Sequence, residues 1–414
     1  MAMKRALFSL IVVAGMMWLA GCDHYTCSTT FGASTCTPGT TTTSPSNASA
    51  FAFAVDQNGS IDGYTLEATA GTFEATPGYT TTTVPANLGS AGVVVAQGKF
   101  LYAVFEDLQQ IYGWTIDSTG NLTALSGMPI TDTNIGGIGL DAYYNEQVVI
   151  TNPTGTLLFV SEAGNNQILV YQISSSGAVT AAAGSPFSTV PAGIEPENLA
   201  MDGLGKYLYV SEDSGDHSGS IVVGYSVSSS GGLTEIGSTF FNDPIWEMQG
   251  DASGKYMIGI SGKTAHYYGS DDDNIYVYAI DSPGGALSAV AGSPFATQYA
   301  PFNIAVQPGS SNGEYVYSFS INDAGTEANP IEGYQLNTST GALSPVSASP
   351  FTSLTTPTAW GQFDPSGAYL FFYSGAAPSV SLGALSVGTS GGLTAAGSTA
   401  ALTTSGYWAA SDVP

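Results

Sequence analysis

The sequence predicts an all-β fold, a β-propeller of seven blades that each contain four antiparallel strands. The first observation is a Gly-x-Leu element whose third residue recurs seven times, at Phe73, Leu122, Val179, Leu233, Leu287, Leu343 and Leu393. The steps between these positions are 49, 57, 54, 54, 56 and 50 residues. The second observation is that each repeat holds several short segments of strand-forming residues, separated by turns rich in Gly and Ser. Repeats of this length and composition are typical of propeller blades.

One complete repeat, residues 197–241, shows the expected order of strands within a blade. Residues 198–202 are predicted as the innermost strand, 207–211 as the second, 220–227 as the third and 233–238 as the fourth. Inner strands pack on both faces near the ring centre, which explains small or apolar residues such as Ala305 and Val306. Comparable repeats cover residues 90–130, 144–187, 245–295, 300–351 and 358–398.

The first repeat is incomplete, and this predicts how the ring closes. Residues 52–56, 60–66 and 72–75 match a second, third and fourth strand, but no innermost strand precedes them. The chain ends with an unpaired segment, Tyr407 to Asp412, which resembles an innermost strand. We therefore expect the C-terminal strand to complete the N-terminal blade, because closure removes the exposed edges of an open array. The Ser-Pro-Phe triplets that end at Phe187, Phe295 and Phe351 belong at the ends of outer strands, since Pro cannot donate to a ladder.

Residues 1–21 are predicted to be the signal peptide of an exported lipoprotein. Lys4 and Arg5 precede an apolar run from Ala6 to Ala20, which is too short to favour a membrane-spanning helix. The run ends Leu19-Ala20-Gly21-Cys22, which resembles the lipobox of bacterial lipoproteins and implies lipidation of Cys22. We expect a protein that is held in the bacterial cell envelope through its N-terminal lipid alone, facing the periplasm or the cell surface.

Residues 22–50 are predicted to connect this lipid to the propeller, which is expected to cover residues 51–414. The stretch 37–50 is rich in Thr, Ser and Pro without an apolar pattern, as is typical of a flexible tether. Cys27 and Cys36 are the two further cysteines, and an oxidising compartment favours a disulfide between them. Too few other ligands lie nearby for a structural zinc site.

The charge balance argues against nucleic acid as a partner. The chain has 32 acidic and 6 basic residues, a formal charge of −26, and no arginine follows Arg5. Such a surface repels polyanions and lacks the guanidinium groups that grip phosphate. The negative charge either keeps an exported protein soluble or recruits divalent cations. Asp271, Asp272 and Asp273 form the densest acidic run and are the candidate ligands for Ca²⁺, with an ordinary solvated charge run as the alternative.

The repeats resemble the lactonase-type seven-bladed propellers, a group that includes bacterial 6-phosphogluconolactonase and the fungal muconate cycloisomerase. The resemblance rests on Gly-Lys-Tyr-Leu-Tyr-Val at 205–210, on Ile-x-Val-Tyr third strands at 168–171 and 275–278, and on Gly-Ala-Leu turns. Active members of the group carry a Pro-His pair at the start of an innermost strand and arginines near the central funnel. The matching pairs here are Pro196-Glu197, Pro244-Ile245, Pro301-Phe302 and Pro357-Thr358. This departure, and the acidic funnel that we expect, make a phosphorylated lactone an unsuitable substrate.

A mouth of the central funnel is the expected ligand site, lined by loops that enter innermost strands and loops that join second to third strands. The candidate ligand-binding residues there are Glu162, Trp246, Phe302 and Trp360. The candidate catalytic carboxylates, which would act as acid and base with water, are Glu197, Glu212 and Glu247. Solvated loop ends and turn caps are the alternative interpretation of these carboxylates. The three histidines, His24, His217 and His266, fall in no recognisable catalytic arrangement.

Three hypotheses for function follow. The leading one is a lipid-anchored binding or interaction module of the envelope, a monomer whose partner is an envelope protein or a neutral glycan. The second is a lactonase-like hydrolase whose substrate is not phosphorylated. The third is a Ca²⁺-stabilised protein of surface adhesion or structure.

Overall fold

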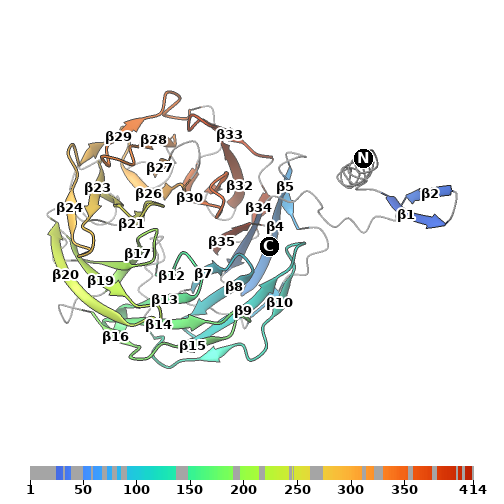
Figure 1. Ribbon diagram of the computed structural model, residues 1–414, viewed down its shortest axis with the longest axis horizontal. Coiled ribbons are helices and arrows are strands. Elements are labelled where there is room, and N and C mark those ends of the chain that lie inside the picture. Colours follow the sequence, from blue (N-terminus) through green and yellow to red (C-terminus); the bar gives the residue numbers. More distant parts are fainter. Residues whose placement is uncertain are drawn as a thin grey trace, which may run out of the picture. The chain divides into compact units, whose positions relative to one another are not determined.

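A computed structural model of the chain shows the predicted ring of seven antiparallel sheets (Figure 1). By its internal contacts the chain divides into a unit of residues 1–46 and a unit of residues 47–414. Among the residues that the structure describes, no helix has both the length and the apolar character needed to cross a membrane. The described residues are 25–30, 33–38, 50–56, 59–67, 72–76, 82–84, 91–136, 148–189, 196–213, 220–241, 245, 247–261, 274–309, 314–320, 330–352, 358–374, 380–397, 400–402 and 406–412.

Each blade runs from the ring centre outward in four strands, and blades are numbered here from 1 to 7 along the chain. The innermost strands are β35 (Gly406–Asp412), β7 (Ala91–Ala96), β12 (Val149–Thr151), β17 (Pro196–Met201), β21 (Glu247–Gly250), β26 (Pro301–Val306) and β30 (Thr358–Phe363). The second strands are β3 (Ala50–Asp56), β8 (Phe100–Phe105), β13 (Leu157–Glu162), β18 (Tyr207–Asp213), β22 (Tyr256–Ser261), β27 (Glu314–Ser320) and β31 (Tyr369–Ser374).

The outer half of each blade is built in the same order. The third strands are β4 (Ser60–Glu67), β9 (Gln110–Ile116), β14 (Gln167–Ile173), β19 (Ser220–Val227), β23 (Asn274–Ile280), β28 (Glu332–Leu336) and β32 (Val380–Val387). The fourth strands are β5 (Thr72–Ala75), β10 (Leu122–Ala124), β15 (Val179–Ala181), β20 (Leu233–Phe241), β24 (Leu287–Ala289), β29 (Leu343–Pro345) and β33 (Leu393–Ala395). Strand β20 runs three residues beyond the predicted end at Ser238, because its pairing with β19 resumes after an irregularity at Gly224 and Tyr225.

The predicted closure of the ring is confirmed. Strand β35 pairs antiparallel with β3 over seven residue pairs, from Ala50 opposite Asp412 to Asp56 opposite Gly406. The last strand of the chain therefore supplies the innermost strand of blade 1, whose other strands come from its beginning (Figure 1). This pairing leaves neither the first nor the last blade with an open inner edge.

At the perimeter of the ring, the Ser-Pro-Phe triplets form turns that follow the fourth strands. Pro186, Pro294 and Pro350 follow cis peptide bonds, as does Pro129 in blade 2. Beyond these turns the chain returns to the third strand, so the prolines lie where no ladder bond is lost. In blade 6 the return is a single bridge between Ile331 and Phe351. The short returning strands are β6 (Thr82–Thr83), β11 (Ile130–Thr131), β16 (Phe187–Ser188), β25 (Phe295–Ala296) and β34 (Ala400–Leu402).

The hydrophobic core is divided among the boundaries between blades. Seven clusters of buried side chains each combine residues of two neighbouring blades. The second strands are buried throughout in β8, β22 and β27, because both faces of each blade are covered by another blade. This explains why these strands read as continuous runs of apolar and aromatic residues rather than as an alternation.

Buried tyrosines also link blades through hydrogen bonds to glycine carbonyls of the next blade. Tyr102 donates to the oxygen of Gly177 at 2.7 Å, and Tyr209 donates to that of Gly285 at 2.7 Å. Tyr317 makes the equivalent bond to Gly391 at 2.9 Å. Burial raises the pKa of all three hydroxyls, so they remain protonated donors. These glycines are the first residues of the Gly-x-Leu elements of the sequence, which therefore fix the spacing between blades.

Substituting Gly285 by Ala is expected to destabilise the fold much more than the same change at Gly127. Both glycines have positive φ, which costs an L-residue about 1–2 kcal/mol. A Cβ at Gly285 would lie 2.4 Å from Ile236 and 2.6 Å from Tyr207, whereas nothing lies within 4 Å at Gly127. The clash adds about 1–3 kcal/mol of overpacking strain. Urea unfolding of both variants measures the difference, and equal losses would contradict this account of blade spacing.

Outside the propeller, the structure describes a hairpin of β1 (Tyr25–Thr30) and β2 (Ala33–Pro38). Its register places Cys27 directly opposite Cys36. Opposite Cα atoms in an antiparallel pair lie about 4.5–5.5 Å apart, within the span of a disulfide. The disulfide itself stays a prediction.

Candidate functional site

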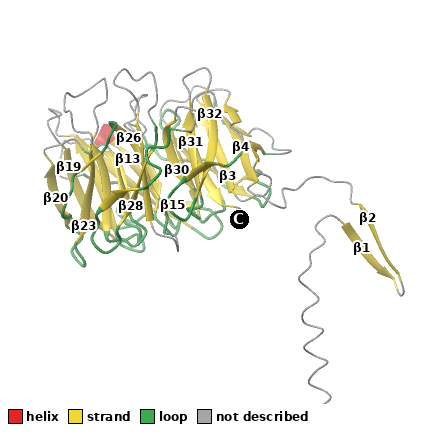
Figure 2. Ribbon diagram, turned by 90° about the horizontal axis from the view of Figure 1, so that it is seen from above, coloured by secondary structure: helices red, strands yellow, loops and turns green. Residues whose placement is uncertain are grey.

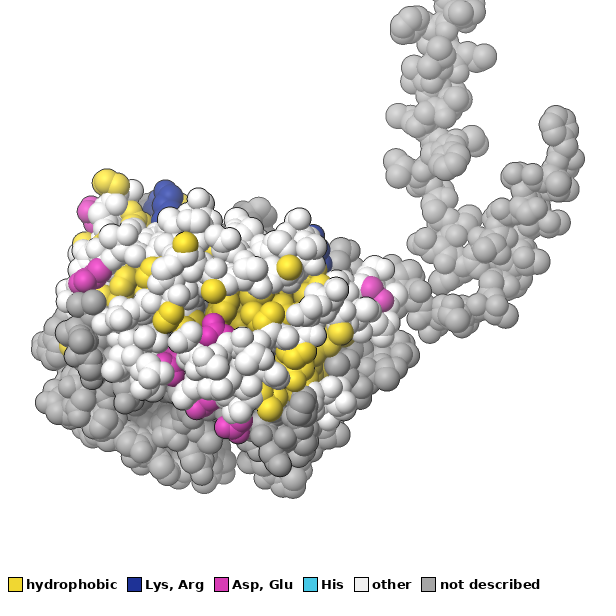
Figure 3. Space-filling view, turned by 90° about the horizontal axis from the view of Figure 1, so that it is seen from below, with side chains coloured by type: hydrophobic (Ala, Val, Ile, Leu, Met, Phe, Trp, Pro, Cys, Tyr) yellow, Lys and Arg dark blue, Asp and Glu magenta, His cyan; other side chains and the backbone are white. Residues whose placement is uncertain are grey.

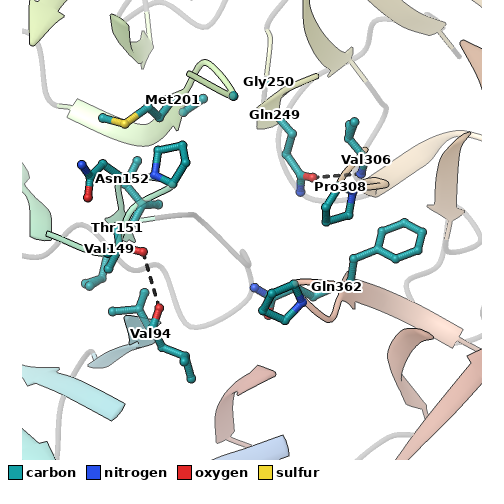
Figure 4. Close-up of a pocket in the computed structure, with 18 of the residues that line it drawn as sticks. Val94, Val149, Thr151, Asn152, Met201, Gln249, Gly250, Val306, Pro308 and Gln362 are labelled. Atoms are coloured by element: carbon teal, nitrogen blue, oxygen red, sulfur yellow. Dashed lines mark hydrogen bonds between the residues drawn. The ribbon is translucent and has the colours of Figure 1, made fainter. Parts of the chain in front are cut away.

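A cavity of about 620 Å³ lies at the centre of the propeller, between the innermost strands of blades 2 to 7 and the turns that follow them (Figure 4). The turns belong to the face of the ring where most described loops gather in Figure 2. The 3₁₀ helix η1 (Ala163–Asn165) lies on the opposite face. Cavities of about 300–1,000 Å³ are typical of small-molecule sites.

The two sides of this cavity differ in chemistry. We call the apolar residues on the side from blades 2 to 4 the aliphatic wall: Val93, Val94, Val95, Val148, Val149, Ile150, Ala200 and Met201. The same side also carries Gln97, Thr151, Asn152 and Asp202, toward the turns that follow the innermost strands. We call the side from blades 5 to 7 the carboxamide wall; its polar members are Gln249, Asn303, Gln307 and Gln362. Figure 4 shows Val94, Val149 and Met201 across the cavity from Gln249 and Gln362.

A hydrogen-bonded network holds part of the carboxamide wall in place. The Glu247 carboxylate is buried and accepts from Asn303 Nδ2 at 2.9 Å, from the Ile304 N–H at 3.1 Å and from Gln249 Nε2 at 2.9 Å. Asn303 Oδ1 accepts from the Gly361 N–H at 2.9 Å. The network joins the innermost strands of blades 5, 6 and 7, so the side chains of Gln249 and Asn303 are fixed before any ligand binds.

Gln307 is the polar group of this wall with unused hydrogen-bonding capacity. Its Nε2 donates to the Gly367 oxygen at 2.6 Å, which fixes the orientation of the amide. Its Oε1 is buried and has no hydrogen-bond partner among the described residues. Leaving a buried acceptor unpaired costs about 1–3 kcal/mol.

The funnel is not acidic where the structure describes it, contrary to our expectation from the sequence. Asp202 is the one charged residue among the described lining, and it is buried in its own turn. Its carboxylate accepts from the N–H groups of Leu204, Lys206 and Tyr207. Burial raises the pKa of Asp202, and these three hydrogen bonds oppose the rise. On the side of the ring shown in Figure 3, acidic side chains are scattered among neutral ones rather than gathered.

Comparison with known proteins agrees with this architecture. Residues 40–245 match the family described as "Lactonase, 7-bladed beta-propeller". This chain is a seven-bladed β-propeller whose residues 40–245 resemble the lactonase type. No curated protein gives a significant match.

Solved structures confirm the propeller fold of this chain. A Bacteroides fragilis protein whose description suggests a 6-phosphogluconolactonase is 15% identical, with a TM-score of 0.62, and the match covers 88% of this chain and 99% of that one. A Lactobacillus plantarum protein is also 15% identical, with a TM-score of 0.59 and the same coverage. A protein of unknown function from Desulfotomaculum acetoxidans is 12% identical, with a TM-score of 0.56, covering 86% of this chain and 99% of that one.

Of the ligand-binding residues predicted from the sequence, Trp360 lies in the cavity lining, and Phe302 is half-buried without being part of it. Glu162 is fully buried in blade 3, where its Oε2 accepts from the Asn165 N–H at 2.9 Å and caps η1. Its Oε1 has no partner among the described residues. Trp246 lies outside the described residues.

The predicted catalytic carboxylates are not brought together at this cavity. Glu247 is committed to the network that holds Asn303 and Gln249. Glu197 and Glu212 lie near each other in the ladder between β17 and β18, where Pro196 is opposite Glu212, but their side chains lie outside the described residues. Cys22 and the candidate Ca²⁺ ligands Asp271, Asp272 and Asp273 also lie outside them. Within the described part, no group of three or more His, Cys, Asp or Glu side chains is arranged to hold a metal.

Sequence reasoning missed the carboxamide wall of this propeller. Gln249, Gln307 and Gln362 occupy innermost strands or their turns, where we expected only small or apolar residues. A polar side chain at such a position was the available signal. The three residues are more than 50 positions apart along the chain, so their meeting depends on the arrangement of blades.

Proposed function

We propose that this propeller binds a neutral, non-phosphorylated sugar lactone in its central cavity. The observation that carries the proposal is the carboxamide wall, a set of amide side chains in a cavity without basic residues in its described lining. Sugar hydroxyls donate to amide oxygens and accept from amide N–H groups, so this wall suits a polyhydroxylated ring. The family match supports a lactone as the ligand class.

The same wall argues against a phosphorylated ligand. Phosphate sites are built from arginine, lysine or rows of backbone N–H groups. The described lining has neither lysine nor arginine, and no arginine follows Arg5 in the sequence. The net charge of −26 adds a long-range repulsion for any dianion.

Calorimetric titration of the full chain tests the proposal with glucono-δ-lactone and its 6-phosphorylated form. We expect binding of the neutral lactone and none of the phosphorylated one. Gln362→Leu should weaken binding about fivefold, because Gln362 is the exposed amide of the lining and one hydrogen bond contributes about 1 kcal/mol. Gln335→Leu, on the exposed side of β28, is the matched control and should leave affinity unchanged. Equal affinity for both lactones, or none for either, would contradict the proposal.

Hydrolysis of the bound lactone is the second candidate function, and the family match favours it. Water attack on the lactone carbonyl needs a general base, and the carboxylates of Glu247 and Asp202 are occupied by hydrogen bonds. We propose Glu197 or Glu212 for this role. A pH-stat assay of glucono-δ-lactone with Glu197→Gln and Glu212→Gln tests it. Unchanged hydrolysis rates in both variants would show that neither glutamate is the general base. If the native protein hydrolysed the lactone no faster than buffer alone, the proposed hydrolase activity would be contradicted.

We further propose that the propeller serves as a binding module in the cell envelope, attached through Cys22. The lipobox-like sequence that ends at Cys22 supports this proposal. Expressed in a bacterial host, Cys22→Ser is expected to move most of the protein from the membrane fraction to the soluble fraction, because the lipid is lost. Cys27→Ser is the control and should remain with membranes. Immunoblots of the two fractions measure the result, and a membrane-bound Cys22→Ser protein would contradict lipid attachment.

A further inference from the structure

We infer that the ligand of the central cavity is amphipathic, with an uncharged hydrogen-bonding head on the carboxamide wall and an alkyl or acyl flank on the aliphatic wall. The inference rests on the proposed function, because it takes the cavity as the ligand site. It extends that function from a sugar lactone to lactones that carry a hydrocarbon substituent.

The two walls differ at the same structural position. In blades 2 to 7, one residue of each innermost strand pairs with the third apolar residue of the second strand, so these residues lie at one level around the ring. The third apolar residues are Tyr102, Phe159, Tyr209, Ile258, Tyr317 and Phe371. In blades 2 to 4 this residue is Val94, Ile150 or Ala200. In blades 5 to 7 it is Gln249, Ala305 or Gln362. The level is therefore apolar on one side and mainly polar on the other.

The aliphatic wall packs against the core clusters between blades and keeps part of its surface uncovered. Val93, Val94 and Val95 are only partly buried, as are Ile150 and Met201, although all five belong to innermost strands. Covering this surface with hydrocarbon contributes about 25 cal/mol of binding free energy for each Å² removed from water. A fully hydroxylated ligand would leave that gain unused along Val94, Ile150 and Met201, whose side chains have no hydrogen-bonding groups.

The size of the cavity agrees with a ligand larger than one sugar ring. Its 620 Å³ fall in the middle of the range of about 300–1,000 Å³ for drug-sized ligands. A single ring placed at Gln307 and Gln362 fills the carboxamide side only. The remaining volume along Val94 and Met201 is where a chain of several methylenes fits (Figure 4).

The test is a calorimetric series with the full chain and γ-lactones of increasing alkyl length, from γ-butyrolactone through γ-hexalactone to γ-octalactone. We expect affinity to rise about fourfold for each methylene, the equivalent of about 0.8 kcal/mol. Val94→Thr keeps the shape of the side chain but exposes a hydroxyl on the aliphatic wall, so it should reduce the gain per methylene. Val387→Thr, on the outer part of blade 7, is the matched control and should keep the full gain.

The outcomes separate this inference from the proposed function. If glucono-δ-lactone binds and the γ-lactones show no gain with chain length, the inference fails and the proposed function stands. If affinity rises with chain length but Val94→Thr keeps the full gain, the chain lies elsewhere and the inference also fails. If neither class of lactone binds, both fail.

Discussion

A chain that ends at residue 402 is expected to lose its cooperative fold. This deletion removes β35, which supplies the innermost strand of blade 1 and pairs with β3 over seven residue pairs. Phe51 and Phe53 of β3 are fully buried in the intact protein, and they would lie beside an open sheet edge. Removing the strand should cost more than about 5 kcal/mol, the lower end of the stability of a typical domain. An exposed apolar edge is also a template for aggregation.

Thermal unfolding and size-exclusion chromatography measure this effect. The expected result is a protein without a sharp melting transition that elutes largely as aggregate. A chain that begins at Asn47 is the matched control, because residues 47–414 form one compact unit. It should melt cooperatively at nearly the temperature of the full chain. A truncated protein that ends at residue 402 and still melts cooperatively would show that the ring does not depend on its closing strand.

Glu314→Gln is expected to stabilise the protein at pH 8 by about 3 kcal/mol and to leave it unchanged at pH 4. Glu314 is buried between blades 5 and 6, where it accepts a hydrogen bond from the Ala252 N–H at 3.0 Å. Burial, and secondarily the charge of Asp251, raise the pKa of Glu314 from its usual 4.5 to about 7. Each unit of such a shift corresponds to about 1.4 kcal/mol.

The sign of the pH dependence follows from the direction of that shift. The folded state binds the proton of Glu314 more tightly than the unfolded state, so folding gains nothing from ionisation of this group. Stability contributed by the protonated form is complete below about pH 4.5 and is lost as the pH rises through about 7. Glutamine stays neutral and its oxygen still accepts from Ala252, so this part of the pH dependence should vanish in the variant.

Urea unfolding between pH 4 and pH 8 measures the difference between the two proteins. Glu74→Gln, at an exposed position of β5, serves as the control and should follow the native protein at every pH. Parallel stability curves for Glu314→Gln and the native protein would show that Glu314 does not titrate in a buried site.

The sequence was sufficient to predict the scaffold because propeller geometry repeats along the chain. The Gly-x-Leu element recurs at each turn where a tyrosine or phenylalanine of the preceding blade packs, as at Gly285 and Gly391. Closure was predictable for the same reason. The first repeat lacks an innermost strand, and the segment from Tyr407 onward is an innermost strand without a blade. The predicted end of β20 was wrong because the irregular pairing with β19 extends the strand, and the amino-acid composition of the segment does not show this.

The candidate site was harder to predict because it is assembled from one or two residues of each blade. Gln249, Gln307 and Gln362 stand in three separate repeats, and each by itself resembles an ordinary polar residue at the end of a strand. The prediction of an acidic funnel was wrong because the total charge of a chain does not show where its acidic side chains lie. Asp202 and Asp364 face inward to cap turns, where backbone N–H groups hold their carboxylates. Trp360, predicted from the loops that enter innermost strands, lies in the lining of this cavity.

The central claim is that the cavity between the aliphatic and carboxamide walls is the ligand site, and a crystal structure with a bound ligand tests it most directly. Crystals of the full chain would be soaked with glucono-δ-lactam, a neutral analogue that does not hydrolyse. The account predicts density for the analogue in the central cavity, with a hydroxyl or N–H group within hydrogen-bond distance of the Gln362 side chain. Density at another face of the ring, with an empty central cavity, would contradict it.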